Sequence, residues 1–472
     1  MIKIKSVVTI SSLILLLLSC TSTLVHSQEH SDKQYFGYVA DQDILALGQI
    51  IEKTKEEYIN VIENPKLEIA CITKINPQHS SYTEFLSASV DYKHPRIKRD
   101  PSSKFSLAVA AYISSKASSK DEAKDFFNIC LKSIAASLDS KSDFFTEGDS
   151  EYLKKLPKKL GIIGIEFVTQ DDPDKNTVIR AFKNGPAYAV GIRAGDIITS
   201  IDGVTIKDLR GQDSIAMLRG EVDTYVSLEV QRSLNESPIK FDIQRKSISS
   251  PSIESKLLVP DYGYIQIYSL GSSVSKGLAK ELLTLYTENK NDLRGLILDL
   301  RFCTGGLLNQ ANGVVAPFLP ERSLVTEIKG RTNDANFKLT THPDDHFKSG
   351  VVDPTSYTKT YLPAYKDVPI VILINKETAS GAEIIAVAMQ EYKRAIIMGQ
   401  NSSGESTLQT IFPMHSGEAL KITTAIWLSP LGKSIQDIGI SPDIVTEKIK
   451  LSEFATEDDA TIKRALTFLM KN

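Results

Sequence analysis

The chain has 472 residues, 42% of them hydrophobic and 24% charged, which is enough for two or three domains with sizeable buried cores. Its formal net charge of −3 gives no electrostatic reason to expect nucleic-acid binding. The seven histidines show no spacing typical of metal ligands, and His342-Pro-Asp-Asp-His346 is interpreted as a polar loop, so we expect no metal and no other cofactor.

Residues 1–27 predict an export signal. A basic start precedes residues 7–18, which are almost wholly apolar but too short a run for a membrane-spanning helix. Leu17-Leu18-Ser19-Cys20 resembles a bacterial lipobox, which would anchor the chain to a membrane through a lipid on Cys20. Val25-His26-Ser27 resembles an ordinary cleavage site, and an uncleaved anchor is the third alternative. In each case we expect an exported protein of the periplasm or cell envelope.

Residues 32–157 are predicted to form a mainly helical region, because apolar residues recur with a helical period over 44–61 and 126–138. Between these two stretches, residues 93–104 are basic and interrupted by prolines. We therefore expect an exposed loop there, open to proteolytic nicking.

Three cysteines, Cys71, Cys130 and Cys303, remain once the export signal is removed, and an odd number cannot form a complete set of disulfides. Cys71 and Cys130 both lie in predicted helices. They either pair with each other or remain as two buried thiols.

Residues 158–250 resemble a PDZ domain, through a glycine-rich stretch at 160–167 and the run GPAYAVGIRAGDII at 185–198. Consecutive backbone N–H groups in such a stretch can hold a terminal carboxylate while a peptide adds to the sheet as a strand. The alternative is a module that only packs against the rest of the chain. The residues predicted to bind peptide are Leu160, Gly161, Ile162, Ile163, Gly164 and Ile165.

Residues 251–472 alternate between predicted strands and helices, which is typical of an α/β core. The predicted strands and helices at the start of this part are 264–267, 274–287, 296–300 and 307–318. Residues 325–366 are polar and are interpreted as a surface insertion. A last strand region at 435–444 and a closing helix at 455–470 complete the expected core.

One segment of this core carries the main functional signal. Residues 371–374 predict a short buried strand, 378–382 a turn of small residues, and 383–392 a helix. The hydroxyl of Ser380 would therefore lie at the positive end of a helix, next to free backbone N–H groups. Such a place best supports an alkoxide or an oxyanion, so Ser380 is a candidate nucleophile.

Four segments in order resemble the C-terminal processing, or tail-specific, serine peptidases. They are LILDLRFCTGGLLNQA (296–311), INKETASGAEIIAVAMQEYKRAIIMG (374–399), LQTIFPMHSGEALKITTA (408–425) and SPLGKSIQDIGISPDI (429–444). With the PDZ-like part they cover about two thirds of the chain. The resemblance implies a multidomain α/β and α+β protein with a ClpP/crotonase-like peptidase core. It also implies unfolded or C-terminally exposed proteins as substrates.

Members of that family carry a nucleophilic serine, a general-base lysine about 25 residues later and a glutamine four residues beyond the lysine, which orients it. Ser380 matches the serine and Gln409 matches the glutamine, and Glu383 stands where the family carries a glutamate. The lysine position falls on Glu405, in Gly404-Glu405-Ser406.

The resemblance also implies two donors for the oxyanion. One is the N–H of Gly381, which follows the nucleophile, and the other is the N–H of a glycine after a strand. In this chain the second donor is assigned to Gly305 of Thr304-Gly305-Gly306, because only glycine allows so close an approach of the backbone to a substrate.

The missing lysine leaves two functions open. Glu405 is a much weaker base than a neutral lysine, and its charge opposes an oxyanion. Lys376, Lys421 and His79 are alternatives that nothing in the sequence requires. The chain is either a serine endopeptidase that selects protein C-termini through its PDZ-like part, or an inactive relative that binds C-terminal peptides or regulates a partner. An envelope scaffold with an internally filled groove is a third alternative, and no oligomeric state follows from the sequence.

Overall fold

The structure is a computed structural model that describes ten stretches of the chain. They are residues 38–75, 101–149, 160–169, 176–209, 211–232, 237–248, 251–289, 293–345, 365–414 and 417–471. The predicted export signal and His79 lie outside them. In these ten stretches, no helix combines the length and the apolar character that a membrane crossing requires.

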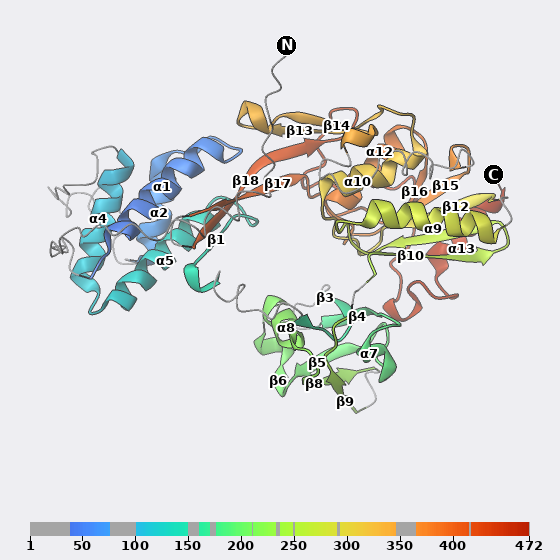
Figure 1. The fold of residues 1–472 in the computed structure, drawn as a ribbon, viewed down its shortest axis with the longest axis horizontal. Helices are drawn as coiled ribbons and strands as arrows, with labels where there is room; N and C mark the ends of the chain where they lie inside the picture. The colour runs from blue at the N-terminus through green and yellow to red at the C-terminus, as the bar shows by residue number, and fades with distance from the viewer. Residues whose placement is uncertain are drawn as a thin grey trace, which may run out of the picture.

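The N-terminal region is helical, as predicted (Figure 1). Its helices are α1 (Asp41–Glu57), α2 (Asn64–Ile75), α4 (Pro101–Lys116) and α5 (Lys120–Ala136). Helix α4 begins at Pro101, a residue that suits the first turn of a helix, so the loop expected at 93–104 does not extend over its last four residues. A disulfide between Cys71 and Cys130 joins α2 to α5.

A strand from near the other end of the chain completes the core of the helical region. Leu420 and Ile422 of β18 (Ala419–Leu428) are fully buried among the helices. The short strand β1 (Asp143–Phe145), which follows α5, pairs with β18 in antiparallel fashion and buries Phe144 in the same core. The helices therefore pack on a strand that also belongs to the C-terminal part of the chain.

The PDZ-like region is a separate, mainly antiparallel sheet with a core of its own. It consists of β2 (Leu160–Gly161), β3 (Ile165–Thr169), β4 (Asn176–Ala181), α7 (Pro186–Ala189), β5 (Ile197–Ile201), β6 (Val204–Thr205), α8 (Gly211–Leu218), β7 (Gly220–Glu221), β8 (Tyr225–Gln231) and β9 (Ile239–Gln244). The main strand order is β3-β4-β5-β8-β9. Burial alternates along β8, as expected for a strand with one face on the core.

The C-terminal core is built on a six-stranded sheet with the order β10-β11-β12-β15-β16-β19. All neighbours are parallel except the β10–β11 pair at the edge. The strands are β10 (Ile253–Val259), β11 (Tyr262–Ile267), β12 (Gly295–Asp299), β15 (Ile370–Ile374), β16 (Ile396–Gly399) and β19 (Ile444–Val445). Every residue of β11, β12 and β15 is buried, because helices cover both faces of the sheet.

One face is covered by α9 (Val274–Glu288), α10 (Leu308–Val315) and α12 (Gly381–Glu391), and the other by α13 (Ala460–Lys471). Helix α13 corresponds to the predicted closing helix. The strand region expected at 435–444 is reduced to β19, which begins only at Ile444.

A second sheet contradicts part of the expectation for 325–366. Strands β13 (Leu324–Gly330) and β14 (Phe337–Thr340) lie in that segment, and β13 pairs with β18. Val325 and Ile328 of β13 and Leu339 of β14 are buried in the main core, so these two strands are part of the core. The remaining strand, β17 (Thr407–Pro413), forms a hairpin with β18.

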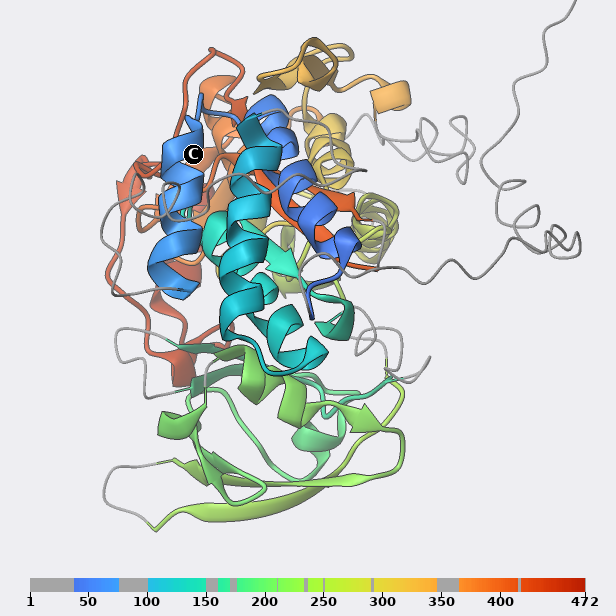
Figure 2. The ribbon, with the colours of Figure 1, turned by 90° about the vertical axis from the view of Figure 1, so that its left-hand side faces the viewer.

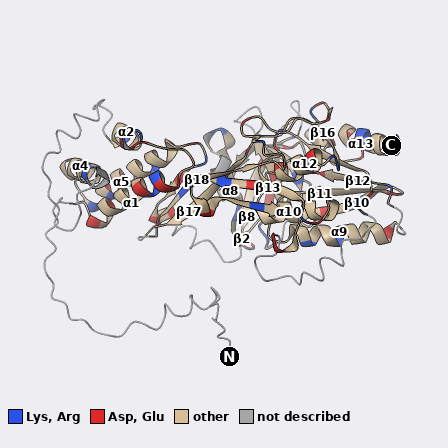
Figure 3. Cartoon of the chain, turned by 90° about the horizontal axis from the view of Figure 1, so that it is seen from above, with Lys and Arg blue, Asp and Glu red and all other residues tan. Residues whose placement is uncertain are grey.

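This hairpin joins the helical region to the C-terminal core. Figure 1 shows β17 and β18 extending from the C-terminal core to the helices, with the PDZ-like region below the core. In the turned view of Figure 2 the helices lie side by side above the PDZ-like sheet. Figure 3 shows acidic and basic residues interspersed along these helices, in line with the small net charge.

Candidate active site

Three loops converge at one edge of the parallel sheet. They follow β12, β15 and β16, which are neighbours in the sheet, and the carboxyl ends of parallel neighbours lie at the same edge. The first loop carries Gly305, the second carries Ser380 and the third carries Glu405. The topology thus brings together three of the residues that the sequence singles out.

Ser380 occupies a strained turn between β15 and α12. Its φ of 52° and ψ of −120° are rare for a residue with a side chain, and such strain is typical of functional sites. It is the residue at which α12 begins, so its half-buried hydroxyl lies at the positive end of the helix. The N–H of Ala379 donates to the carbonyl of Cys303 over 3.1 Å, which ties the turn to the loop after β12.

Gly305 packs directly against this turn. Its φ is +88°, and a Cβ on it would lie 2.7 Å from the nitrogen of Gly381 and 2.9 Å from the Cβ of Ser380. Leu270 holds the loop on both sides, because its N–H donates to the carbonyl of Gly305 and its carbonyl accepts from Leu307, each over 2.9 Å. Only glycine fits this position without displacing the serine turn.

The neighbouring Cys303 is buried and has no disulfide partner. Burial raises the pKa of its thiol to about 12, although the N–H of Gly305, which points at the sulfur, works in the opposite direction. Cys303 is therefore a protonated thiol and not a competing nucleophile. The same contact means that the N–H of Gly305, predicted as an oxyanion donor, already has a partner within the protein.

Glu383 joins the serine turn to the loop after β16. Its fully buried carboxylate accepts hydrogen bonds from the N–H groups of Ser380 and Glu405, both over 2.9 Å. The N–H of Gly404 and the hydroxyl of Ser402 donate to its other oxygen over 2.7 and 2.5 Å. Burial raises the pKa of Glu383, and these four donors counteract that rise. Since Ser380 and Glu405 share one carboxylate oxygen, their main chains lie side by side.

The side chain of Glu405 has a partner that the sequence did not suggest. Lys141 Nζ lies 2.7 Å from Glu405 Oε1, and the two side chains are 43% and 36% exposed. The main chain of Glu405 is held separately, since its carbonyl accepts from Trp427 Nε1 over 3.2 Å. The amine of a lysine from the segment before β1 thus lies beside the side chain that stands at the family's lysine position.

Lys141 is fixed by the turn between α5 and β1. The carboxylate of Asp139 accepts from the N–H groups of Lys141 and Ser142 over 2.8 and 2.7 Å. Burial works against the charged form of Asp139, but these two N–H groups and the Thr423 hydroxyl hold its pKa below the usual range. These hydrogen bonds therefore fix the backbone of the turn that carries Lys141.

Gln409 lies in β17, close to the same turn. Its Nε2 donates to Thr407 Oγ1 over 3.0 Å and to Thr423 Oγ1 over 3.3 Å, and the N–H of Thr423 donates to Ser142 Oγ over 3.3 Å. Thr423 therefore links Gln409 to Ser142, the residue that follows Lys141.

The two lysines considered as replacements lie elsewhere. Lys376 is exposed, with Nζ 3.9 Å from Glu377. Lys421 lies in β18, opposite Asp143 of β1 and Ile411 of β17. The separation of 264 residues between Lys141 and Glu405 explains why no local sequence pattern indicated their contact.

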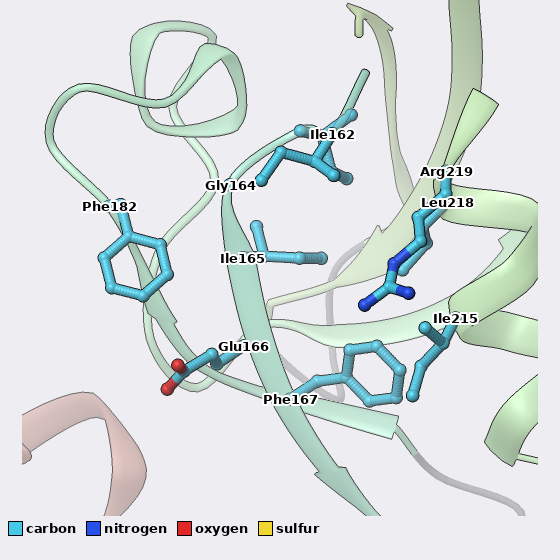
Figure 4. Close-up of a pocket in the computed structure, with 10 residues that line it drawn as sticks. Ile162, Gly164, Ile165, Glu166, Phe167, Phe182, Ile215, Leu218 and Arg219 are labelled. Atoms are coloured by element: carbon cyan, nitrogen blue, oxygen red, sulfur yellow. The ribbon is translucent and has the colours of Figure 1, made fainter. Parts of the chain in front are cut away.

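The PDZ-like region has a groove of about 310 Å³ between β3 and α8 (Figure 4). Its walls are Ile162, Ile163, Gly164, Ile165, Glu166, Phe167, Phe182, Ile215, Leu218 and Arg219. Four of the six residues predicted to bind peptide line it, whereas Leu160 and Gly161 instead form β2, which pairs with β7. Figure 4 shows the Arg219 guanidinium directed toward the groove.

Two features of the groove suit a peptide end. The N–H groups of Ile163 and Gly164 find no hydrogen-bond acceptor among the described residues, so they are free for a ligand. Phe167 and Ile215 form an apolar wall beside them, and Ile215 is 42% exposed. An N–H pair, a cation and an apolar wall match a C-terminal carboxylate with an apolar last side chain.

No group of three or more potential metal ligands gathers among the described residues. His342 lies near Glu321 and Asp344, with nitrogen–oxygen distances of 3.8 and 3.5 Å. These are contacts of a polar loop, and His346 lies outside the described residues.

Family models match two parts of the chain. Residues 261–446 match the model described as peptidase family S41, and residues 178–232 match a PDZ domain model. The first match contains all three loops of the site, and the second contains most of the PDZ-like sheet.

Curated relatives agree with these matches. The chain is 30% identical over 320 residues to a carboxy-terminal-processing protease of Bartonella bacilliformis, covering 67% of this chain and 69% of the relative. It is 26% identical over 376 residues to the carboxy-terminal processing protease CtpA of Bacillus subtilis, covering 78% of this chain and 74% of that protein.

The fold is shared with solved structures at low sequence identity. The photosystem II D1 C-terminal processing protease superimposes with a TM-score of 0.54 at 19% identity, over 87% of this chain and 94% of the other. A putative S41 protease of Bacteroides fragilis gives a TM-score of 0.52 at 14% identity, over 90% and 97% of the two chains.

Proposed function

The chain belongs to peptidase family S41, among the C-terminal processing serine proteases, and from this membership we propose that it is an active serine endopeptidase with Ser380 as nucleophile. Its substrates are proteins with an unfolded or exposed C-terminus. The observation that supports this most is the strained Ser380 turn, with Gly305 packed against it and Glu383 bonded to its N–H.

The chemistry proposed is acyl transfer. Ser380 Oγ attacks the scissile carbonyl, and the N–H of Gly381 stabilises the oxyanion, while Gly305 packs against the turn that carries both residues. The acyl-enzyme that forms is then hydrolysed by water. The buried Glu383 holds the serine turn and the Glu405 loop in register for both steps.

The PDZ groove is proposed to select substrates by their C-termini. Its unpartnered N–H groups and the Arg219 guanidinium would bind the terminal carboxylate, and the apolar wall would bind the last side chain. A fluorescent peptide with an apolar C-terminal residue should bind, and the same peptide with an amidated C-terminus should not.

We also propose that the enzyme works outside the cytoplasm, in the periplasm or cell envelope. The export signal predicted at 1–27 supports this, as does the Cys71–Cys130 disulfide, because such bonds persist in oxidising compartments. A lipid on Cys20 remains part of the proposal. Labelling with a radioactive fatty acid in cells, compared with Cys20→Ser, tests for the lipid.

A second candidate function is a peptidase relative that only binds. Glu405 at the lysine position favours it, because removing the base of a serine nucleophile typically costs about 10⁴-fold or more. In that case the PDZ groove would bind C-terminal peptides or regulate a partner.

Proteolysis of an unstructured protein with a defined C-terminal tag separates the two functions. Cleavage by the native chain that disappears in Ser380→Ala supports the peptidase. Absence of cleavage by the native chain, with activity in Glu405→Lys, supports the binding protein.

A further inference from the structure

We propose that Lys141 is the general base of this peptidase. Lys141 lies in the turn between α5 and β1, and its amine contacts Glu405 in the loop after β16. The inference rests on the proposed peptidase function and adds its missing catalytic residue. In this scheme Glu405 positions Lys141 through their ion pair.

The first argument is the position of the amine relative to the nucleophile. The N–H groups of Ser380 and Glu405 donate to the same oxygen of Glu383, so the two residues are adjacent. Lys141 Nζ lies 2.7 Å from the carboxylate of Glu405. The amine of Lys141 is thus held at the side chain of the residue whose main chain lies next to the serine turn.

The second argument comes from Gln409, which matches the glutamine that orients the lysine in this family. In this structure Gln409 contacts Thr423, and Thr423 bonds to Ser142, next to Lys141. Two markers of the family's lysine, the loop position of Glu405 and the orienting glutamine, thus both lie close to Lys141.

The third argument is the rigidity of the support. Asp139 fixes the backbone of Lys141 through two N–H groups, and the N–H of Ile59 bonds to the carbonyl of Thr423 over 2.9 Å. The turn is therefore held by the helical region and by β18 together. A base on a fixed backbone loses little conformational entropy when it is positioned at the nucleophile.

The ion pair with Glu405 does not prevent this role. Both side chains are more than one third exposed, and ion pairs of this kind hold their partners only weakly. Glu405 itself remains a poor proton acceptor, because a carboxylate is a much weaker base than an amine.

Each proton has a defined place in this scheme. The scheme starts from the neutral amine, which forms when the ammonium gives one proton to solvent water. Lys141 Nζ then accepts the proton of Ser380 Oγ as the Oγ–C bond forms and the carbonyl electron pair moves to oxygen. Lys141 then gives this proton to the leaving amine nitrogen as the peptide C–N bond breaks. In deacylation it accepts a proton from the attacking water and returns it to Ser380 Oγ as the ester bond breaks.

The test compares Lys141→Ala and Lys141→Arg with the native enzyme, on the tagged unstructured protein and on labelling of Ser380 by a fluorophosphonate. We expect both variants to lose at least about 10³-fold in both rates, because a guanidinium keeps its proton near neutral pH. Lys132→Ala is the matched control. Lys132 is a half-exposed lysine paired with Asp149 in the same part of the chain, and we expect its variant to keep native rates.

Two further measurements separate a base from a structural residue. Added methylamine should partly restore Lys141→Ala, since a small amine can replace a proton acceptor but not a structural side chain. The double variant Lys141→Ala/Glu405→Lys should also regain activity, because it places a lysine on the loop itself. Thermal unfolding of each variant should match the native protein.

Native rates in Lys141→Ala, with native cleavage still dependent on Ser380, would overturn the inference and leave the proposed function standing. Native rates in Lys141→Arg would overturn it as well, because a permanent cation cannot be the base. A native chain that neither cleaves nor reacts with the fluorophosphonate would overturn both.

Discussion

Gly305 shows how much of the site depends on the absence of a single carbon atom. A Cβ there would lie 2.7 Å from the nitrogen of Gly381. We expect Gly305→Ala to lower kcat by about 10²- to 10³-fold, because the new methyl group displaces the oxyanion donors. Gly432→Ala is the control, since Gly432 also has a positive φ, +76°, but nothing within 4 Å of the Cβ position. Equal kcat values for the two variants would contradict the close packing.

Glu383 is the residue on which the geometry of two loops depends. Its carboxylate accepts four hydrogen bonds, and Glu383→Gln would turn an NH₂ group toward two of the donors. We expect the free energy of unfolding to fall by about 1–3 kcal/mol and Ser380 labelling to slow. Glu391→Gln, at the other end of α12, is the matched control, because Glu391 accepts only two bonds. The prediction fails if denaturant titration gives both variants the same stability.

The residues of the site differ in how far sequence could predict them. Ser380 and Gly305 belong to short local patterns of strand, turn and small residues, and the structure places both in one site. The contact of Lys141 with Glu405 follows from no local pattern, because the two residues are 264 positions apart in the sequence. A salt bridge between distant segments leaves no periodic signal in one sequence.

At the scale of elements, the β17–β18 hairpin links the helices to the peptidase core. Leu420 of β18 is fully buried among the helices. We expect Leu420→Ala to cost about 2–5 kcal/mol in the free energy of unfolding and to lower peptidase activity, since the Lys141 turn rests on the same strand. Ile411→Ala, on the exposed side of the hairpin, should cost much less, because Ile411 is 57% exposed. Denaturant titration of both variants provides the measurement.

The disulfide between α2 and α5 makes a second prediction at this scale. It closes a loop with a sequence separation of 59 residues, and removing such a bond costs about 2–5 kcal/mol. We expect Cys71→Ser/Cys130→Ser to lower the Tm of the helical region and to leave peptide binding by the PDZ groove unchanged. Circular dichroism and fluorescence anisotropy measure the two effects. A native Tm in the double variant would contradict the prediction.

The elements that sequence predicted well are those with strong periodicity. The helices α1, α5 and α9 and the buried strands β12 and β15 have clear apolar patterns. Strands β13 and β14 were missed, because each buries only part of its residues and their pairing with β18 is not visible locally. The strand predicted at 435–444 is longer than the observed β19, because the apolar residues before Ile444 pack as an irregular segment held by turns.

At the scale of the whole molecule, one arginine connects the PDZ-like region to the core. Arg180 of β4 lies 4.1 Å from the ring centre of Tyr268 and 5.5 Å from that of Phe454, and it pairs with Glu166. We expect Arg180→Ala to let the PDZ-like region unfold separately, as a second transition in scanning calorimetry. Lys183→Ala, an exposed cation close by, is the control and should keep the native profile. A single transition in both variants would show that the contact is dispensable.

The position of β18 has a consequence for the order in which the chain folds as it is synthesised. Its residues complete the core of helices that lie far earlier in the chain, and its neighbour β17 directly follows the loop that carries Glu405. A chain whose synthesis has not reached β18 therefore has neither a finished helical region nor a finished site. Peptidase activity would therefore begin only after nearly the last strand has been added to the fold.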